Sequence, residues 1–393
     1  MKRIITLLFA IALWLPASAQ KDAAYWNKMA DGMSQALITN FWGANFEGYP
    51  TRYYFNYGSN LSNMTTNHYW PQAHAMDVLV DAYMRTKDKQ YKKIYPLWWQ
   101  GAPEYNFAGK MNPKDAWWNV FVDDMEWIAL AQIRMWESTG NTMYINKARQ
   151  MYDDWIWTTW GPEDEAPWYG GITWKTDVGK SKNACSNGPA ALIAARLHRF
   201  YDKAKFKGGK CKSAYLNEAI KIYTWEKNVL FDRKTGAVYD NINRRGFIQK
   251  NWIFTYNIGT FLGAAHELYL ATGDKQYLDD AVLAASYVIN NMTHNGVLND
   301  ATEGDGGLFH GIFFRYFVKL INEESLDMAT RKRFHDWFTN LATVMAEEGV
   351  NHNTMLYAGR WRKAPKDDEP VGLTPHLTGC MLMEAMCVLK PLK

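Results

Sequence analysis

The chain has 393 residues, of which 48% are hydrophobic and 15% are aromatic, with 19 tryptophans among them. This composition supports a large core and excludes an intrinsically disordered chain. The formal net charge of +4 is close to balance and lacks the basic excess typical of a nucleic-acid partner, so none is predicted. The many indole rings suit sugar binding as well as core packing, because their flat faces stack on the apolar faces of pyranose rings.

The first segment of the chain has the three parts of a secretory signal peptide. A basic K-R start precedes an apolar run over residues 4–15, and A-S-A, ending at Ala19, is a small-x-small cleavage site. The run is too short to cross a membrane and no later stretch is long enough, so no transmembrane segment is predicted. We expect residues 1–19 to be a signal peptide and residues 20–393 to form a single domain, an enzyme or a binding protein, which is exported to the periplasm or outside the cell.

A turn followed by a tyrosine and a helical run recurs along the chain and marks one set of helices. The copies begin at Thr86, Thr139 and Thr272, with a weaker one at Ser213. In the two Thr-Gly copies, the glycine fits the end of one helix and the following Asn or Asp fits the cap of the next. With residues 23–41 and the charged stretch 322–350, these runs predict six outer helices.

A second set of segments lies between these copies. They start with polar and aromatic residues and continue as apolar helices rich in small residues, which is typical of helices buried on both sides. The six segments begin at His68, Val120, Cys185, Phe254, Gly306 and Thr374. Strand signals are weak, apart from a short hairpin arm near Gly236. The alternation predicts an all-α fold, a closed (α/α)6 barrel of six inner and six outer helices, with an open solenoid as the alternative. The loops that enter the inner helices would meet at one mouth and form a cleft.

Three pairs of adjacent aspartates occur in the chain, and the repeat separates them. Asp153-Asp154 and Asp279-Asp280 fall on outer helices and are expected on a solvated face, whereas Asp123-Asp124 begins an inner helix at the mouth, among tryptophans. The helix dipole favours an acidic residue in a first turn by up to about 1 kcal/mol. That explains one aspartate better than two in a buried setting, because burying charge is costly.

Paired carboxyl groups are what glycoside hydrolysis requires. One carboxylic acid protonates the leaving oxygen, and one ionised carboxylate acts at the sugar ring. Side chains of adjacent residues leave a helix in different directions, and carboxyl groups roughly 5 Å apart have the geometry of a retaining enzyme. Because each charge raises the proton affinity of the other, Asp123 and Asp124 are suited to hold one proton between them near neutral pH.

The motifs on four of the predicted inner helices resemble those of glycoside hydrolase family 76. They read W-x-x-x-F-V-D-D-M-E-W, S-N-G-P-A-A-L-I-A-A-R-L, T-Y-N-x-G and G-L-F-x-G-I-F-x-R-Y. The resemblance extends over nearly all of the chain after the signal peptide. It implies an (α/α)6 endo-α-1,6-mannanase that acts on polysaccharide or oligosaccharide α-mannan with retention. It also implies that Asp123 is the nucleophile and Asp124 the general acid/base, while Glu126 is expected to be structural or orienting.

Two positions depart from the family pattern. Ile258 follows Tyr256-Asn257 where the family usually has Gln, and His310 stands where Lys is expected. The first change predicts the loss of a polar sugar contact. Both changes would alter linkage or chain-length preference without touching the chemistry.

Residues near the predicted mouth are candidates for substrate binding. They are His68, Trp70, Trp118, Trp174, Asn183, Asn187, Tyr256, Asn257 and Asp305. Among the tryptophans beside the aspartate pair, Trp118 is the one predicted to be a stacking platform for a sugar ring. Plainer roles compete: Asn187 before Gly188-Pro189 fits a helix start, and Asp305 fits a turn. His74 is expected to be a packed, hydrogen-bonded core histidine.

The remaining features predict no metal or cofactor. Cysteines at 185, 211, 380 and 387 lack a metal-type spacing, and they leave open one or two disulfides or buried free thiols. No phosphate, nucleotide or Ser/His/Asp motif is present. We expect a monomer. The alternatives to an endo-mannanase are an exo-glycosidase, an unsaturated-uronide hydrolase, a transglycosylase and a non-catalytic exported glycan-binding protein.

Overall fold

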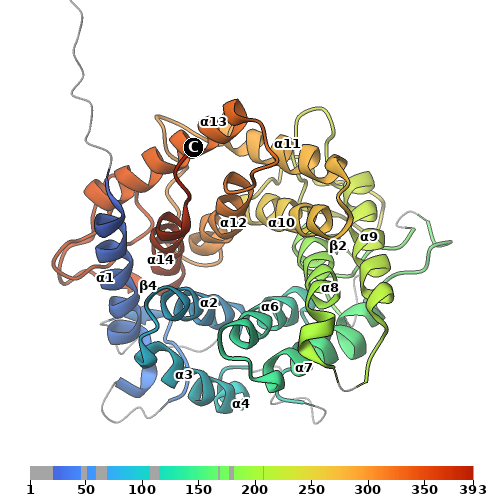
Figure 1. Ribbon diagram of the computed structural model, residues 1–393, viewed down its shortest axis with the longest axis horizontal. Coiled ribbons are helices and arrows are strands. Elements are labelled where there is room, and N and C mark those ends of the chain that lie inside the picture. Colours follow the sequence, from blue (N-terminus) through green and yellow to red (C-terminus); the bar gives the residue numbers. More distant parts are fainter. Residues whose placement is uncertain are drawn as a thin grey trace, which may run out of the picture.

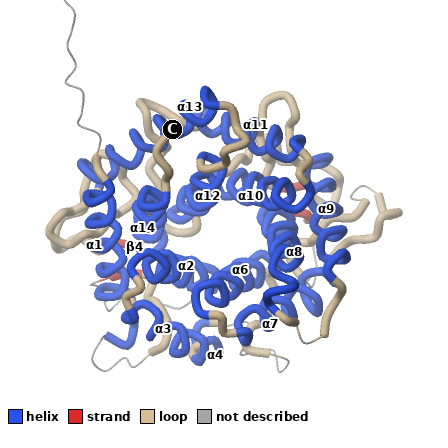
Figure 2. The backbone as a smooth tube through the Cα atoms, in the orientation of Figure 1, coloured by secondary structure: helices blue, strands red, loops and turns tan. Residues whose placement is uncertain are grey.

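The computed structural model describes residues 21–45, 51–58, 69–106, 115–166, 169–176, 181–206 and 208–392. Two concentric rings of helices surround one axis (Figure 1). Figure 2 shows that helices make up most of the backbone and that strands are confined to short segments. The predicted signal peptide, residues 1–19, lies outside the described residues.

The inner ring is closed. Its helices are α2 (Tyr69–Thr86), α6 (Val122–Thr139), α8 (Ala184–Ala204), α10 (Thr255–Thr272), α12 (Gly306–Ile321) and α14 (Leu373–Val388). Each packs against the next in chain order, and α14 returns to pack against α2. This closure confirms the predicted (α/α)6 barrel and excludes the open solenoid.

The outer ring alternates with the inner one along the chain. Its helices are α1 (Ala23–Phe41), α3 (Lys89–Gln100) with α4 (Ala102–Tyr105), α7 (Thr142–Met151), α9 (Lys212–Val229), α11 (Lys275–Asn291) and α13 (Met328–Val344). Short helical turns add Gly43–Asn45, Tyr152–Ile156, Trp157–Thr159 and Met345–Gly349. The outer helices cover the inner ones, for example α1 against α14 and α9 against α8.

The turns between rings have the predicted local chemistry. Gly140 adopts a left-handed conformation with φ of 72°, and its N–H donates to the carbonyl of Trp136, which ends α6. The next residue, Asn141, accepts from the N–H of Met143 and starts α7. Gly273 and Asp274 repeat this arrangement between α10 and α11. These signals are local, so the sequence alone was sufficient to place them.

Short antiparallel strands tie together the loops that enter the inner helices. Strand β1 (Tyr57–Gly58) pairs with β4 (Val371–Gly372), which leads directly into α14. Strand β2 (Lys182–Asn183) pairs with β3 (Asn241–Ile242) and leads into α8. The predicted hairpin near Gly236 is also present, because Phe231 bridges Val238. The pairing of β2 with β3 fixes the loop before β3 beside the start of α8.

Close contacts between inner helices depend on glycine. A Cβ atom added at Gly259 of α10 would lie 2.7 Å from the Cα of Phe313 on α12. One added at Gly188 of α8 would lie 2.6 Å from Thr260 Oγ1 on α10. Real atoms do not approach so closely, so larger residues at these positions would force the inner helices apart.

The two outer aspartate pairs are only partly solvated, which corrects the expectation for them. Asp280 is buried, accepts a hydrogen bond from the Tyr223 hydroxyl at 2.8 Å and pairs with Lys227. Asp153 accepts from Arg149 and Tyr215. Only one residue of each pair is exposed: Asp154 in the first pair and Asp279 in the second. Asp153 and Asp280 therefore stabilise contacts of the outer ring.

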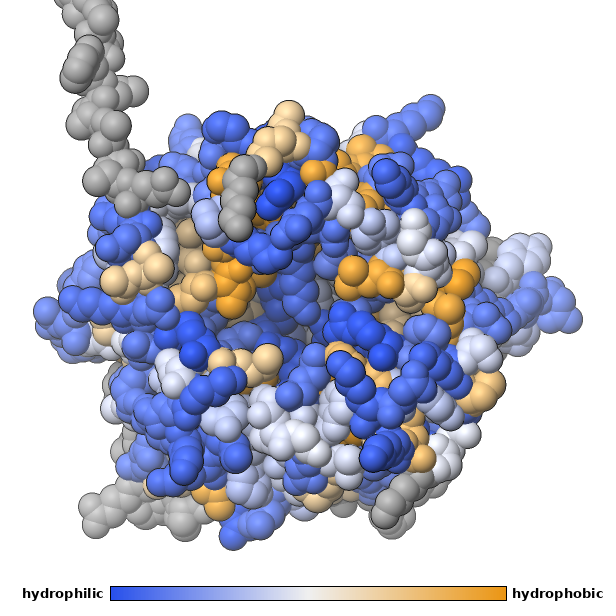
Figure 3. All heavy atoms as spheres, in the orientation of Figure 1, coloured by the Kyte–Doolittle hydropathy of each residue, from blue (hydrophilic) through white to orange (hydrophobic). Residues whose placement is uncertain are grey.

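Charged side chains meet between the inner helices. Asp77 and Asp81 of α2 pair with Arg134 of α6 and Arg315 of α12. Figure 3 shows a hollow near the centre of one face, with hydrophilic residues in its depth and both hydrophobic and hydrophilic residues around it. Throughout the described ranges, the helices lack the combination of length and apolar character that a membrane crossing requires.

Candidate active site

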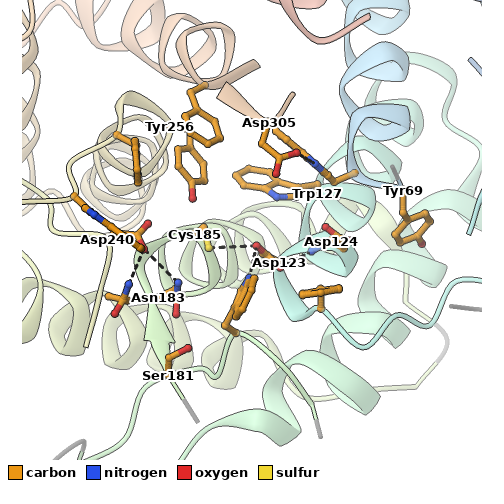
Figure 4. A pocket seen from close by; sticks show the side chains of 17 residues that line it. Tyr69, Asp123, Asp124, Trp127, Ser181, Asn183, Cys185, Asp240, Tyr256 and Asp305 are labelled. Carbon is orange, nitrogen blue, oxygen red and sulfur yellow. Dashed lines mark hydrogen bonds between the residues drawn. The ribbon is translucent and has the colours of Figure 1, made fainter. Parts of the chain in front are cut away.

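A cavity of about 590 Å³ opens where the loops enter the inner helices (Figure 4). Its aromatic lining residues are Tyr69, Trp70, Phe121, Trp127, Trp174, Trp252, Phe254, Tyr256 and Phe309. Its polar lining residues are Asp123, Asp124, Ser181, Asn183, Cys185, Asp240, Asn241 and Asp305. A hollow of this size, mostly aromatic with a few grouped polar atoms, is typical of a small-molecule or oligosaccharide site.

The aspartate pair lies in the first turn of α6, whose N-terminal end favours negative charge. The loop that carries Trp174 runs alongside: the Val122 N–H donates to the Trp174 carbonyl at 2.9 Å, and Phe121 bridges Lys175. This pairing brings the Trp174 indole over the start of the helix. The structure thus places Asp123, Asp124 and Trp174 in one cavity, as the sequence predicted.

Three donors converge on the Asp123 carboxylate. Trp174 Nε1 lies 3.1 Å and Cys185 Sγ 3.2 Å from Asp123 Oδ2, and the backbone N–H of Asp124 donates to Asp123 Oδ1 at 3.1 Å. No hydrogen bond from the described residues to the Asp124 carboxyl group accompanies them. Since donors stabilise a charged carboxylate more than a neutral one, the two neighbours differ in proton affinity.

The pKa values of the pair are raised to different extents. Burial raises the pKa of Asp123 to about 6, against the opposing effect of its hydrogen bonds from Cys185, Trp174 and Asp124. Burial raises the pKa of Asp124 well above its ordinary value, and the negative charges of Asp123 and Asp305 add to the effect. The arrangement therefore favours an anionic Asp123 beside a protonated Asp124, the division of roles that acid-assisted nucleophilic attack requires.

Five of the predicted binding residues line the cavity: Trp70, Trp174, Asn183, Tyr256 and Asp305. Trp70 Nε1 donates to Asp305 Oδ1 at 3.0 Å, which joins the start of α2 to the start of α12. The Tyr256 ring stacks on Phe309, with centroids 4.1 Å apart. These contacts hold aromatic faces and polar atoms at fixed positions around the aspartate pair.

Three other predicted binding residues are not among those that line the cavity. Trp118 packs against the core, so it is not placed as a platform beside the pair. Asn187 is buried, and its side-chain amide bonds to the N–H and carbonyl of Ile172 and to the carbonyl of Asn183. Asn257 is buried and donates to Asp240. The fourth, His68, lies outside the described residues.

Asp240 is a cavity residue that the sequence analysis missed. Its Oδ1 accepts from Asn257 Nδ2 at 3.0 Å, and its Oδ2 accepts from Asn241 Nδ2 at 2.8 Å and Asn183 Nδ2 at 3.5 Å. Two asparagines predicted to bind sugar directly therefore also hold this carboxylate. The G-A-V-Y-D-N-I segment that carries it predicts only a hairpin arm, and no spacing in it indicates a site.

Two buried residues, His74 and Glu126, are not among those that line the cavity. His74 is buried, but its ring nitrogens have no hydrogen-bond partner among the described residues, which corrects the expectation of a hydrogen-bonded histidine. Burial lowers its pKa to about 3, so it is a neutral ring packed against Trp127. Glu126 is fully buried, and this burial is the main reason why the pKa of its carboxyl group is raised well above the usual range.

The residues at the two departures from the family pattern are not among those that line the cavity. Ile258 is completely buried in α10 and is not among the residues that line the cavity. His310 bonds to Thr255 Oγ1 at 2.9 Å and to the carbonyl of Asn299 at 3.1 Å. Burial lowers its pKa to about 4.

The cysteines and acidic groups do not form a disulfide or a metal centre in the described part of the chain. All four cysteines are free thiols, and Cys185 and Cys380 are buried. Over the same residues, no three histidine, cysteine, aspartate or glutamate side chains gather as metal ligands would. Of the two interpretations left open by the sequence, the structure has free thiols.

Comparisons with known proteins agree with this site. The model of glycosyl hydrolase family 76 matches residues 25–392. No curated protein sequence matches the chain. An α-1,6-mannanase from Salegentibacter sp. HEL1_6 is similar in structure, with 34% identity, a TM-score of 0.79, and coverage of 93% of this chain and 100% of that one.

Two further solved structures extend the comparison. One is an inactive variant of that mannanase, with two consecutive aspartates replaced by asparagine, in complex with α-1,6-mannotriose; it is 33% identical, with a TM-score of 0.79 and coverage of 93% of this chain and 100% of the other. The other is a protein from Listeria innocua, 28% identical, with a TM-score of 0.76 and coverage of 92% and 96%. Fold and cavity together define a glycosidase built on an (α/α)6 barrel. The chain belongs to glycosyl hydrolase family 76.

Proposed function

We propose that the protein is an exported, retaining endo-α-1,6-mannanase that hydrolyses the backbone of α-mannan. The observation that carries the proposal is the Asp123-Asp124 pair, in which three donors stabilise the anion of the first residue while burial and nearby charge keep the second protonated. The similarity to an α-1,6-mannanase at 34% identity supports the substrate class. In that enzyme, an inactive variant carries changes at two consecutive aspartates.

The chemistry follows from the protonation states. Asp123 attacks the anomeric carbon while Asp124 gives its proton to the glycosidic oxygen, so the glycosidic bond breaks and a glycosyl ester forms on Asp123. Asp124, now anionic, takes a proton from water, and that water attacks the anomeric carbon and releases Asp123. Two displacements at one carbon return it to its original configuration, which makes the reaction retaining.

The substrate contacts divide between stacking and hydrogen bonding. Trp70, Trp174 and Tyr256 offer aromatic faces to mannose rings, and Asp305 and Asn183 offer polar atoms. Asp240 adds a carboxylate held by three amides. A carboxylate has about four acceptor positions, so one remains for a sugar hydroxyl. His68 stays a predicted contact. Trp118, Asn187 and Asn257 are not among the residues that line the cavity, and Asn257 acts on the substrate only through Asp240.

Product size on unbranched α-1,6-mannan tests this function against its alternatives. An endo-acting hydrolase releases oligosaccharides of mixed length early, whereas an exo-glycosidase releases one small product from the start. Products longer than the starting oligosaccharides would identify a transglycosylase. Binding of mannan with no new reducing ends would identify a binding protein. No cleavage of mannan, with activity on unsaturated uronides, would overturn the proposal in favour of another barrel glycosidase.

The rate should have a bell-shaped dependence on pH. Hydrolysis needs Asp123 ionised, so kcat/KM is expected to fall as the pH drops below about 6, the pKa of Asp123. It needs Asp124 protonated, so the fall at high pH comes well above the ordinary aspartate range. The measurement is kcat/KM on a soluble mannooligosaccharide across the pH range. Full activity persisting several units below pH 6 would contradict Asp123 as the attacking anion.

Export and organisation are part of the proposal. Residues 1–19 are proposed to be removed as a signal peptide, which leaves residues 20–393 as one monomeric catalytic domain. N-terminal sequencing of the protein recovered from the periplasm or the culture medium would identify the cleavage site. Export would be contradicted if the protein were recovered inside the cell with its first residues still attached.

A further inference from the structure

The thiol of Cys185 is in direct contact with the carboxylate of Asp123. Cys185 is the second residue of α8 and is only 2% exposed, yet its side chain lines the cavity. Its Sγ lies 3.2 Å from Asp123 Oδ2. Figure 4 shows the sulfur between Asp123 and the hydroxyl end of Tyr256. Core packing alone does not require a buried thiol to contact the carboxylate that is proposed to be the nucleophile.

The direction of this hydrogen bond follows from the chemistry of its partners. An ionised carboxylate only accepts hydrogen bonds, so the thiol must be the donor. Burial, together with the charges of Asp123 and Asp240, raises the pKa of the Cys185 thiol well above its usual range, so the thiol keeps its proton. The Tyr256 hydroxyl lies on the other side of the sulfur (Figure 4), and the hydrogen bond that the thiol donates is the one to Asp123.

The other ionisable groups around Asp123 do not replace this donor. They are Asp124 and Glu126 on α6, Asp240 before β3, Asp305 at the start of α12, Tyr256 on α10, and Lys175, whose ammonium lies over the Phe121 and Trp174 rings. Most are carboxyl groups, which disfavour a second negative charge nearby. The anion of Asp123 therefore depends on its hydrogen-bond donors.

We infer that Cys185 is a positioning residue, whose thiol donates to Asp123 Oδ2 and holds that carboxylate ionised and correctly oriented for attack. Trp174 donates to the same oxygen from the opposite loop, so the two donors fix the rotation of the carboxylate between α8 and the Trp174 loop. This inference rests on the proposed function, in which Asp123 is the nucleophile.

The test compares two substitutions at Cys185 with a matched control. Cys185→Ala removes the donor and is expected to move the acidic limb of the kcat/KM profile to higher pH by roughly half a unit or more, because the anion loses stabilisation. Cys185→Ser keeps a donor and should leave the limb close to its original position. Cys380→Ala removes another fully buried thiol, on α14, which bonds to Met33 and His376, and should not move the limb.

Two results would overturn the inference. One is an acidic limb of Cys185→Ala that superimposes on those of the unchanged enzyme and Cys380→Ala. The other is a limb of Cys185→Ser displaced as far as that of Cys185→Ala, which would indicate a packing role for the sulfur. Thermal unfolding of each variant shows whether the comparison is made on folded protein.

A second measurement needs no activity. The S–H stretching band of Cys185, identified in infrared spectra by its loss in Cys185→Ser, should shift to higher frequency in Asp123→Ala, because the acceptor is gone. A band that does not move would overturn the inference even if Cys185→Ala fails to fold. If the unchanged protein does not cleave mannan, the proposed function fails, while the infrared result still decides whether the thiol donates to Asp123.

Discussion

Replacing Asp123 by asparagine is expected to lower kcat/KM on α-1,6-mannan by at least about a thousandfold while leaving the barrel folded. The asparagine amide has nearly the same shape, but it is neutral and cannot attack the anomeric carbon. Because the change removes a charge that burial disfavours, the melting temperature should not fall. Initial rates of reducing-end release, measured beside thermal unfolding, check both expectations.

Asp124→Asn should cause a loss of similar size on mannan, for a different reason. This variant lacks the proton for the leaving oxygen but keeps the nucleophile. With an aryl mannoside, whose leaving group needs little protonation, Asp124→Asn should form the glycosyl ester and recover part of its rate, whereas Asp123→Asn should not. The control is Asp279→Asn, a change in an exposed aspartate on outer helix α11. Mannan cleavage within about tenfold of normal by Asp123→Asn would rule out its assigned role.

Asp240→Ala is expected to lower kcat/KM by about tenfold to a hundredfold, the usual effect of losing one hydrogen bond to a charged group. Its carboxylate is fixed by three amides, and among the described lining residues no other acidic group lies near β3, so none of them takes over the contact. The effect should be smaller on a substrate that lacks the hydroxyl bound there. Deoxy-mannose analogues of a short α-1,6-oligosaccharide identify that hydroxyl.

A double-mutant cycle tests whether Asn257 acts through Asp240. Asn257→Ala alone should weaken activity less than Asp240→Ala, because it loosens the carboxylate without removing it. In the Asp240→Ala background, Asn257→Ala should have almost no further effect, since coupled residues are not additive. Fully additive losses would show that Asn257 has a separate role, and an unchanged rate in Asp240→Ala would remove Asp240 from the substrate contacts.

The double ring could be predicted because its signals are local. The residues 23–41 expected for the first outer helix are the bounds of α1, and the Thr-Gly turns ended and started helices where expected. Because inner and outer helices alternate along the chain, few arrangements of the helices in space remained possible. The location of the Asp123-Asp124 pair in the cavity could be predicted because the pair stands at the start of an inner helix, where the entering loops meet.

The parts of the site that were missed depend on contacts distant in sequence. Asp240 reaches the cavity because β3 pairs with β2, a two-residue strand pair with no sequence signal of its own. Trp118 and Trp117 are adjacent aromatics that pack with the core, and nothing local indicates that neither of them lines the cavity. Asn187 was a candidate for sugar or for a helix start, whereas it bonds to Ile172 across a loop. Burial of Asp280 follows from Tyr223 and Lys227 on a neighbouring helix.

The most direct test of the central claim is the anomeric configuration of the first product. The unchanged enzyme is incubated with unbranched α-1,6-mannan, and proton NMR spectra are collected before the new reducing ends equilibrate. Retention by double displacement at Asp123 predicts that α-configured reducing ends appear first and that the β form grows only later by mutarotation. Reducing ends that first appear in the β configuration would contradict the account, because they would require a single inverting displacement.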